Sequence, residues 1–177
     1  YKTKEKLLRA SNKVVCFDAW RAERAEQALH AQVQDWVWVG QARDGGNYSV
    51  GIQKGVGVVD AGQVYRFTYG DAEGEIQKQG VWLCRHNSSN AASAMGVALC
   101  LGLPFESSLA ALQSFTGLAH RCEVVQTEDG VTWVNDSKAT NVGAAVSAIR
   151  SFGDGAPLIL IAGGQAKQED YGMLAGT

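Results

Sequence analysis

Three short polar clusters contain the side chains that could bind a ligand or act in a reaction. The first is Arg85-His86-Asn87-Ser88-Ser89-Asn90, in which Asn87 and Asn90 stand three residues apart at the predicted start of a helix. That spacing lets both amides project to one side of the helix. Each amide offers a donor and an acceptor together, as the edge of an adenine base does. Helix capping is the alternative, because Asn and Ser are preferred N-cap residues, and the residues alone favour it.

The second cluster combines His120-Arg121 with the run Asn135-Asp136-Ser137-Lys138-Ala139-Thr140-Asn141. The run lies between a predicted strand and a predicted helix, and the free backbone N–H groups of a helix N-terminus attract anions. Lys138 adds a full charge, and the planar guanidinium of Arg121 can grip a phosphate. Asp136 suits ribose hydroxyls or a metal-bound water, and Thr140 adds a hydroxyl donor. The alternative, an N-capped surface helix with solvated charges, stays open.

The third cluster is Gly163-Gly164-Gln165-Ala166-Lys167, which follows an apolar run at 158–162. Ligands of open α/β sheets bind at the carboxyl ends of the strands. Paired glycines let a ligand approach the backbone, and Lys167 could neutralise a carboxylate or a phosphate. The segment is not a P-loop, because the Gly-Lys-Ser/Thr ending is absent. A tight turn with an exposed lysine is the alternative that the residues alone favour.

The elements that position these clusters are predicted from hydrophobic periodicity and turn residues. The sequence predicts helical potential at 1–10, strands at 13–17, 36–39, 48–52, 57–60 and 64–67, and helices at 21–32, 87–101 and 107–115. Glycine-bearing turns between the strands of 35–83 favour a small antiparallel sheet. After a boundary at 117–119, the sequence predicts a hairpin at 122–134, a helix at 142–150, a buried parallel strand at 158–162 and a helix from about 169. That βαβ pattern is typical of the start of a doubly wound domain.

Bulk properties exclude several classes of protein. Hydrophobic residues make up 46% of the 177 residues and charged residues 19%, which is typical of a globular rather than a disordered chain. The formal net charge of −2 lacks the basic footprint of a nucleic-acid binder. With neither a signal peptide nor a long apolar span, we expect a cytoplasmic protein without a nucleic-acid or membrane partner.

The four cysteines do not form a recognisable metal or disulfide pattern. Cys16, Cys84, Cys100 and Cys122 each lie in an apolar run, and none belongs to a Cys-x-x-Cys pair. This arrangement favours buried free thiols in a reducing compartment over a zinc site or a disulfide framework.

In order and spacing, the clusters together resemble the Mur ligase family. The most specific segment is 135–141, which resembles the members that add D-glutamate. Sister ligases that add L-alanine, a diamino acid or the terminal dipeptide carry an Asp-Tyr-Ala-His or Asp-Tyr-Asn-Ala type of segment there. Segment 86–90 resembles the family's His-Asn-x-x-Asn, 117–123 its Gly-Leu-x-His-Arg-x-Glu, and 163–167 its Gly-Gly-x-x-Lys. The resemblance runs across nearly the whole chain.

The resemblance implies an α/β fold in two parts. Residues 1–117 would form the later half of the central ATPase domain, with a small β-rich section. Residues 118–177 would begin the Rossmann-like C-terminal domain that brings the amino acid. The UDP-sugar domain, the phosphate-binding loop and the magnesium-holding glutamate and histidine have no counterpart in the 177 residues. We therefore expect these residues by themselves to have no ligase activity, and the intact enzyme to be a monomer.

The implied reaction is a two-step acyl transfer in peptidoglycan synthesis that uses ATP and Mg²⁺. ATP would phosphorylate the carboxylate of UDP-N-acetylmuramoyl-L-alanine, and the amine of D-glutamate would attack the acyl phosphate. Neutralised charge and aligned reactants carry most of such catalysis. Matched residue by residue, Asn87 and Asn90 would contact the adenine. Arg121, Asp136 and Lys138 would contact the phosphates or the ribose of ATP, with Lys138 catalytic. Thr140 and Lys167 would bind the D-glutamate carboxylate.

Two positions depart from the family pattern. The family often has Gly two residues before its His-Asn pair, where this chain has Cys84. The family's carbamylated lysine, whose oxygens suit Mg²⁺, would fall on Glu5, so either Lys4 or Lys6 is the candidate. A solvated lysine-rich helix is the alternative for that segment.

Two other functions compete with D-glutamate ligation. The first is a different amide ligase, such as a sister Mur enzyme or a folylpolyglutamate synthase, and the Ser-Lys-Ala-Thr run argues against it. The second is a nucleotide-binding module without catalytic activity.

Overall fold

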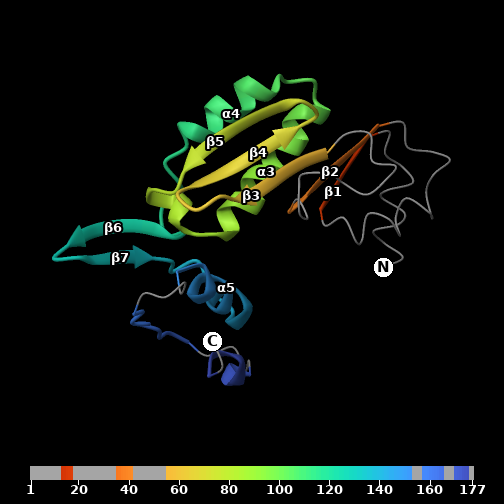
Figure 1. The fold of residues 1–177 in the computed structure, drawn as a ribbon. Coiled ribbons are helices and arrows are strands. Elements are labelled where there is room, and N and C mark those ends of the chain that lie inside the picture. The colour runs from red at the N-terminus through yellow and green to blue at the C-terminus, as the bar shows by residue number, and fades with distance from the viewer. Residues whose placement is uncertain (1–12, 18–34, 42–54, 153–156, 166–169, 176–177) are drawn as a thin grey trace. The chain divides into compact units, whose positions relative to one another are not determined.

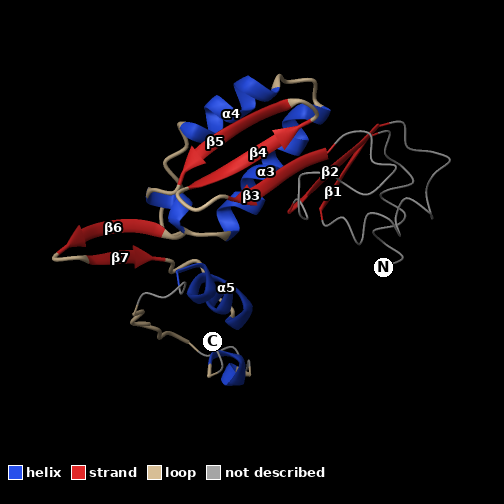
Figure 2. Cartoon of the chain, in the orientation of Figure 1, coloured by secondary structure: helices blue, strands red, loops and turns tan. Residues whose placement is uncertain are grey.

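The computed structural model describes residues 13–17, 35–41, 55–152, 157–165 and 170–175. The chain divides into two compact units. Unit 1 comprises Tyr1–Gln77 and Ser88–Phe115, and unit 2 comprises Lys78–Asn87 and Thr116–Thr177. Figure 1 shows the order of the elements along the chain, and Figure 2 shows that helices and strands occur together throughout. The fold is therefore mixed α/β, whereas the predicted domain boundary near residue 117 stays a prediction.

Unit 1 contains a five-stranded sheet in the order β1-β2-β3-β4-β5. Its strands are β1 (Lys13–Phe17), β2 (Asp35–Gln41), β3 (Gly55–Asp60), β4 (Val64–Tyr69) and β5 (Ala72–Gln77). The strands predicted at 13–17, 36–39, 57–60 and 64–67 are confirmed. The antiparallel prediction is correct only for β3–β5, because β1, β2 and β3 pair in parallel. Parallel strands need a long crossover connection, and residues 18–34 and 42–54 leave length for one.

Tight turns and alternating side chains account for the antiparallel part of this sheet. The β3–β4 turn is closed by Asp60, whose Oδ1 accepts a hydrogen bond from the Gly62 N–H at 3.2 Å. In β4 the side chains of Tyr65 and Phe67 are buried, while Arg66 between them is exposed. This period of two buries one face of the strand. Across the pair, Arg66 Nη2 lies 2.8 Å from Glu75 Oε1 of β5.

Two helices complete the described part of unit 1. Helix α3 (His86–Cys100) buries Ala91, Ala92 and Met95, and helix α4 (Phe105–Gln113) packs against β5. Figure 1 shows both helices behind the sheet in that view. The helices predicted at 87–101 and 107–115 are confirmed within two residues at their ends. Pro104 stands at the N-cap of α4, where its missing N–H costs no helical hydrogen bond.

Unit 2 contains a short 3-10 turn, a hairpin and a helix. The turn η1 (Gly80–Leu83) precedes α3, and the hairpin pairs β6 (Glu123–Glu128) with β7 (Val131–Asn135). Helix α5 (Val142–Phe152) follows, and a second 3-10 turn, η2 (Tyr171–Leu174), contacts it. The predicted hairpin and the helix at 142–150 are confirmed. Among the described residues of this unit, the buried side chains are Val81, Trp82, Cys84, Cys122, Val142 and Val146.

The predicted buried strand at 158–162 is wrong. Residues 157–165 form neither strand nor helix and are exposed, with Ile159 at 90% and Ile161 at 80%. A strand of a parallel sheet needs a neighbour that completes its backbone hydrogen bonds and covers its faces. No strand in the described part of unit 2 pairs with this segment. Apolar content alone therefore does not make it a strand.

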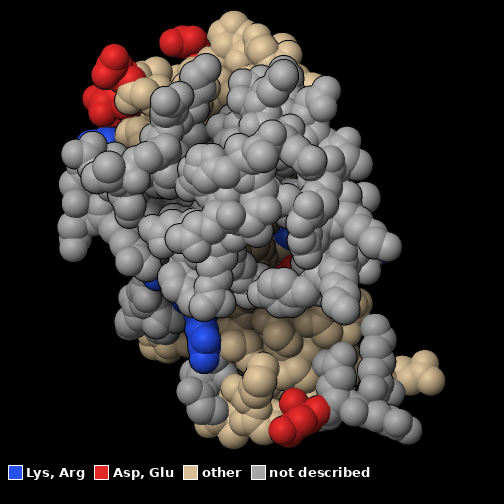
Figure 3. Space-filling model, turned by 90° about the vertical axis from the view of Figure 1, so that its right-hand side faces the viewer, with Lys and Arg blue, Asp and Glu red and all other residues tan. Residues whose placement is uncertain are grey.

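No helix among the described residues is long and apolar enough to cross a membrane. The described atoms on the face drawn in Figure 3 include acidic as well as basic side chains. This mixture agrees with the small formal net charge of −2.

Replacement of Gly117 by alanine is expected to destabilise unit 2 more than replacement of Gly130. Both glycines have a positive φ, +100° and +77°, where an alanine costs about 1–2 kcal/mol. Only at Gly117 would the added Cβ also meet a neighbour, Val81, whose Cβ and Cγ2 lie at 3.1 Å. That crowding should add about 1–3 kcal/mol. Urea unfolding of both variants measures the difference, and equal losses would contradict it.

Candidate functional site

The two parts of the second polar cluster meet in unit 2. The Lys138 N–H donates to the His120 carbonyl at 3.1 Å, and the Cys122 N–H donates to Asp136 Oδ1 at 3.2 Å. Asn135 Nδ2 lies 2.9 Å from His120 Nδ1. The loop that leaves β7 is thus bonded to the segment that enters β6, because the hairpin returns the chain to where it began.

The N-terminus of α5 is capped by Asn141, as the structural alternative for this cluster predicted. Asn141 Oδ1 accepts a hydrogen bond from the Ala144 N–H at 2.8 Å, which satisfies one of the unpaired N–H groups of the first turn. The side chains of Lys138 and Thr140 are nevertheless exposed, while Asp136 is half-buried. Capping therefore does not prevent a ligand from reaching Lys138 and Thr140.

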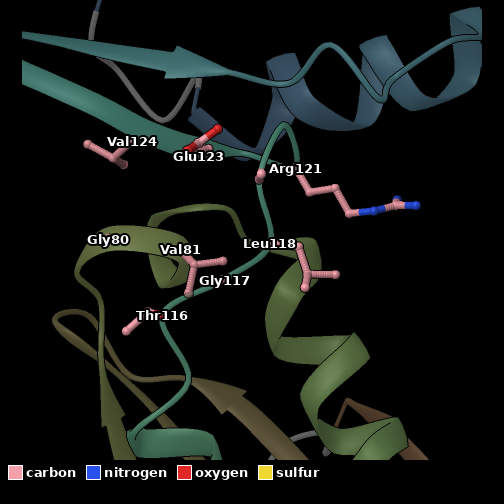
Figure 4. A pocket seen from close by; sticks show the side chains of 9 residues that line it. Gly80, Val81, Thr116, Gly117, Leu118, Arg121, Glu123 and Val124 are labelled. Carbon is pink, nitrogen blue, oxygen red and sulfur yellow. The ribbon is translucent and has the colours of Figure 1, made fainter.

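Arg121 borders a cavity of about 310 Å³ in unit 2. Figure 4 shows Val81 and Leu118 near Gly117, with the guanidinium of Arg121 extending away from Glu123. The cavity therefore has apolar side chains, the cation of Arg121 and the carboxylate of Glu123 at its border. The residues that line it are Gly80, Val81, Thr116, Gly117, Leu118, Ala119, Arg121, Glu123 and Val124.

Asn87 has a structural contact that sequence reasoning missed. Its Nδ2 donates to the Val81 carbonyl at 2.8 Å, which joins the start of α3 to η1. Asn90 lies three residues further along the same helix and is exposed. Through Val81, Asn87 is bonded to the border of the cavity that Arg121 also lines.

A cluster of two thiols and an imidazole lies in the same unit. One side-chain ligand atom from each of Cys84, His86 and Cys122 can be chosen so that all three lie within 4.8 Å of one another. The two thiols are 0% and 1% exposed, and the imidazole is half-buried. Both cysteines are free thiols, as predicted, whereas Cys100 is only half-buried and Cys16 lies outside the residues whose side chains are described.

Hydrogen bonds within this cluster separate the acidities of its members. Hydrogen bonding with Cys122 lowers the pKa of the Cys84 thiol. Hydrogen bonding with Cys84, followed by burial, raises the pKa of the Cys122 thiol. The pair therefore ionises stepwise, with Cys84 first. Hydrogen bonding with Cys122 also raises the pKa of the His86 imidazole.

Comparison with known proteins finds relatives for about half of this chain. No model of a protein family matches it. Proteins named UDP-N-acetylmuramoylalanine–D-glutamate ligase do: one from Pseudomonas savastanoi is 51% identical over 92 residues, half of this chain and 20% of the relative. The relative from Pseudomonas aeruginosa is 48% identical over 101 residues, which are 55% of this chain and 21% of that protein. The relative from Nitrosococcus oceani is 50% identical over 91 residues, which are 51% of this chain and 20% of that protein. About half of this chain is thus similar to proteins named UDP-N-acetylmuramoylalanine–D-glutamate ligase. It spans about a fifth of the length of the curated relatives it matches.

The described structure places most of the residues singled out from the sequence. Asn87, Arg121, Asp136, Lys138 and Thr140 belong to unit 2, whereas Asn90 belongs to unit 1. The three remaining candidates, Lys4, Lys6 and Lys167, lie outside the described residues. Sequence reasoning missed the convergence of Cys84, His86 and Cys122, although Cys84 stands where the Mur ligases often have glycine.

Proposed function

We propose that the protein is an ATP-dependent ligase that adds D-glutamate to UDP-N-acetylmuramoyl-L-alanine in peptidoglycan synthesis, through an acyl phosphate. The observation that carries the proposal is the identity of 48–51% with relatives that bear this enzyme's name. The Ser-Lys-Ala-Thr run at 137–140 supports D-glutamate as the amino acid, because the sister ligases have a different segment there. We further propose that the enzyme works as a cytoplasmic monomer.

The proposed fold follows from the same family. Residues 1–117 form the later half of the central ATPase domain, and residues 118–177 begin the Rossmann-like C-terminal domain. The mixed sheet with β1–β3 parallel supports the first assignment, because nucleotide-binding α/β domains contain parallel strands. The strand, polar loop and helix of 131–152 support the second.

The proposed contacts to ATP come from the start of α3 and from the segments that flank the β6–β7 hairpin. Asn87 and Asn90 bind the adenine, while Arg121, Asp136 and Lys138 bind phosphates or ribose. The hydrogen bonds that hold the 135–141 loop against His120 and Cys122 support a shared site for the last three. Positive charge held in place before the reaction stabilises the charge that develops on a transferred phosphoryl group.

D-glutamate and Mg²⁺ are the other proposed ligands. Thr140 and Lys167 bind the carboxylates of D-glutamate, and the exposure of Thr140 leaves its hydroxyl accessible to such a ligand. Mg²⁺ prefers oxygen ligands and commonly combines one or two carboxylates with phosphate oxygens. The half-buried carboxylate of Asp136 fits contact with a water of such an ion. A carbamate on Lys4 or Lys6 would supply further oxygen ligands.

The test is ATP-dependent phosphate release by a longer protein in which this chain is joined to the flanking domains of the Pseudomonas aeruginosa relative. UDP-N-acetylmuramoyl-L-alanine is the acceptor, and D-glutamate is compared with L-alanine and a diamino acid. We expect release with D-glutamate only. Release with another amino acid would indicate a sister ligase. ATP binding by a folded protein without release would indicate a nucleotide-binding module.

A further inference from the structure

The cluster formed by Cys84, His86 and Cys122 has the chemistry and spacing of a metal site. We propose that these three side chains bind one Zn²⁺ ion in unit 2. Two thiolates and one imidazole are a common zinc ligand set, with a fourth position left for water or another ligand. The inference rests on the geometry of the chain and does not depend on the proposed ligase function.

The distances between the ligand atoms agree with tetrahedral coordination. With Zn–S near 2.3 Å and Zn–N near 2.05 Å, a tetrahedron places a sulfur and a nitrogen ligand about 3.6 Å apart. His86 Nε2 lies 3.8 Å from Cys84 Sγ and 3.9 Å from Cys122 Sγ. The imidazole nitrogen is therefore within a few tenths of an ångström of the required distance from both sulfurs. His86 Nδ1 lies closer to Cys84 Sγ, at 3.3 Å, so binding through Nε2 requires the imidazole ring to turn.

The backbone brings the three ligands together from two separate segments of unit 2. Cys84 follows η1, and His86 begins α3 two residues later. Cys122 immediately precedes β6, 36 residues after His86. The Cys122 N–H is held by Asp136 Oδ1 at 3.2 Å. Outer hydrogen bonds of this kind fix the orientation of the residues that ligate a metal.

Burial favours a structural or tightly held ion. Both sulfurs belong to residues at most 1% exposed, and the half-buried His86 provides the more accessible side. Metal affinity in a preformed site adds to the stability of the folded state. A bound ion would tie the segment before α3 to the segment before β6. Those segments also contain Asn87 and Arg121, next in sequence to ligands.

The test uses the purified, reduced and metal-free protein, titrated with Co²⁺ and then with Zn²⁺. We expect one Co²⁺ per chain, with sulfur-to-cobalt charge-transfer absorption, intense tetrahedral d–d bands, and complete displacement by Zn²⁺. Cys84→Ser, Cys122→Ser and His86→Gln should each weaken Zn²⁺ binding by more than about a hundredfold, because even loss of an outer partner costs roughly tenfold to hundredfold. The matched controls Cys100→Ser and His120→Gln should bind as the unaltered protein does.

A second measurement avoids variants that fail to fold. In the unaltered protein, Zn²⁺ should protect Cys84 and Cys122 from alkylation but leave Cys100 unchanged, as peptide mass spectrometry can show. Absence of thiolate charge transfer in the reduced protein would overturn the proposal. So would equal alkylation of these cysteines with and without Zn²⁺, or a loss of binding in the control variants as large as in the ligand variants.

Discussion

Replacement of Lys138 by alanine is expected to lower kcat/KM for ATP-dependent phosphate release by about a hundredfold to a thousandfold, the usual cost of removing one transition-state donor. Lys138 is exposed, and its backbone N–H is bonded to the His120 carbonyl at 3.1 Å. That bond holds the backbone of Lys138 against His120, the residue that precedes Arg121. Loss of the ammonium charge removes attraction for the phosphoryl oxygens while leaving the backbone bond intact.

The controls for this prediction separate charge at the site from charge in general. Arg150→Ala removes an exposed cation from the last turn of α5 and should leave kcat/KM within about twofold, as expected for a substitution outside the site. Lys138→Arg keeps the charge but not the compact ammonium, so we expect intermediate activity. The assay is steady-state phosphate release by the longer protein with D-glutamate. Equal effects of Lys138→Ala and Arg150→Ala would contradict the assignment of Lys138.

Replacement of Phe67 by alanine is expected to lower the free energy of unfolding by about 3–5 kcal/mol, the typical cost of emptying a buried aromatic position. Phe67 lies in β4 and is 0% exposed. Its partner in β5 is Gly74, which has no side chain, and the side chain of Leu109 packs over that glycine. The loss combines the lost burial of the ring with the cavity that remains.

Phe115→Ala is the matched control, because it removes the same ring from a position that is 42% exposed in the same unit. We expect a loss of about 1 kcal/mol or less there, as for most surface positions. Urea unfolding followed by circular dichroism measures both, with the slope of the transition as a check on the surface exposed. A Phe67→Ala loss no greater than that of Phe115→Ala would show that unit 1 lacks the packed core described.

The described strands and helices were predicted from local patterns with few errors. The run 13–17 coincides with β1, and the hairpin around 128–130 coincides with the β6–β7 turn, where Asp129 and Gly130 both have positive φ. Periodicity and turn residues are properties of adjacent positions, so sequence is sufficient for them. β5 was not predicted as a separate strand, because its Ala-Glu-Gly-Glu-Ile-Gln composition carries little β propensity. Pairing with β4 supplies its stability instead.

The candidate site was partly predictable for the same reason. The polar loop at 135–141 follows a strand and precedes a helix, and both of those elements are local features. The segment at 158–162 shows the limit. Its apolar side chains predict a buried strand, but burial needs partners that local sequence does not identify. The described part of unit 2 offers none.

The resemblance to the Mur ligases, the order of the elements and the identity of the polar clusters follow from the sequence, because each rests on short runs of adjacent residues. Tertiary structure decided the parallel pairing of β1–β3 and the hydrogen bonds that join the 135–141 loop to His120 and Cys122. It also decided the convergence of Cys84, His86 and Cys122. Cys122 reaches Cys84 and His86 only because the chain returns after 36 residues. Contacts over such separations depend on how whole elements pack, which local spacing does not specify.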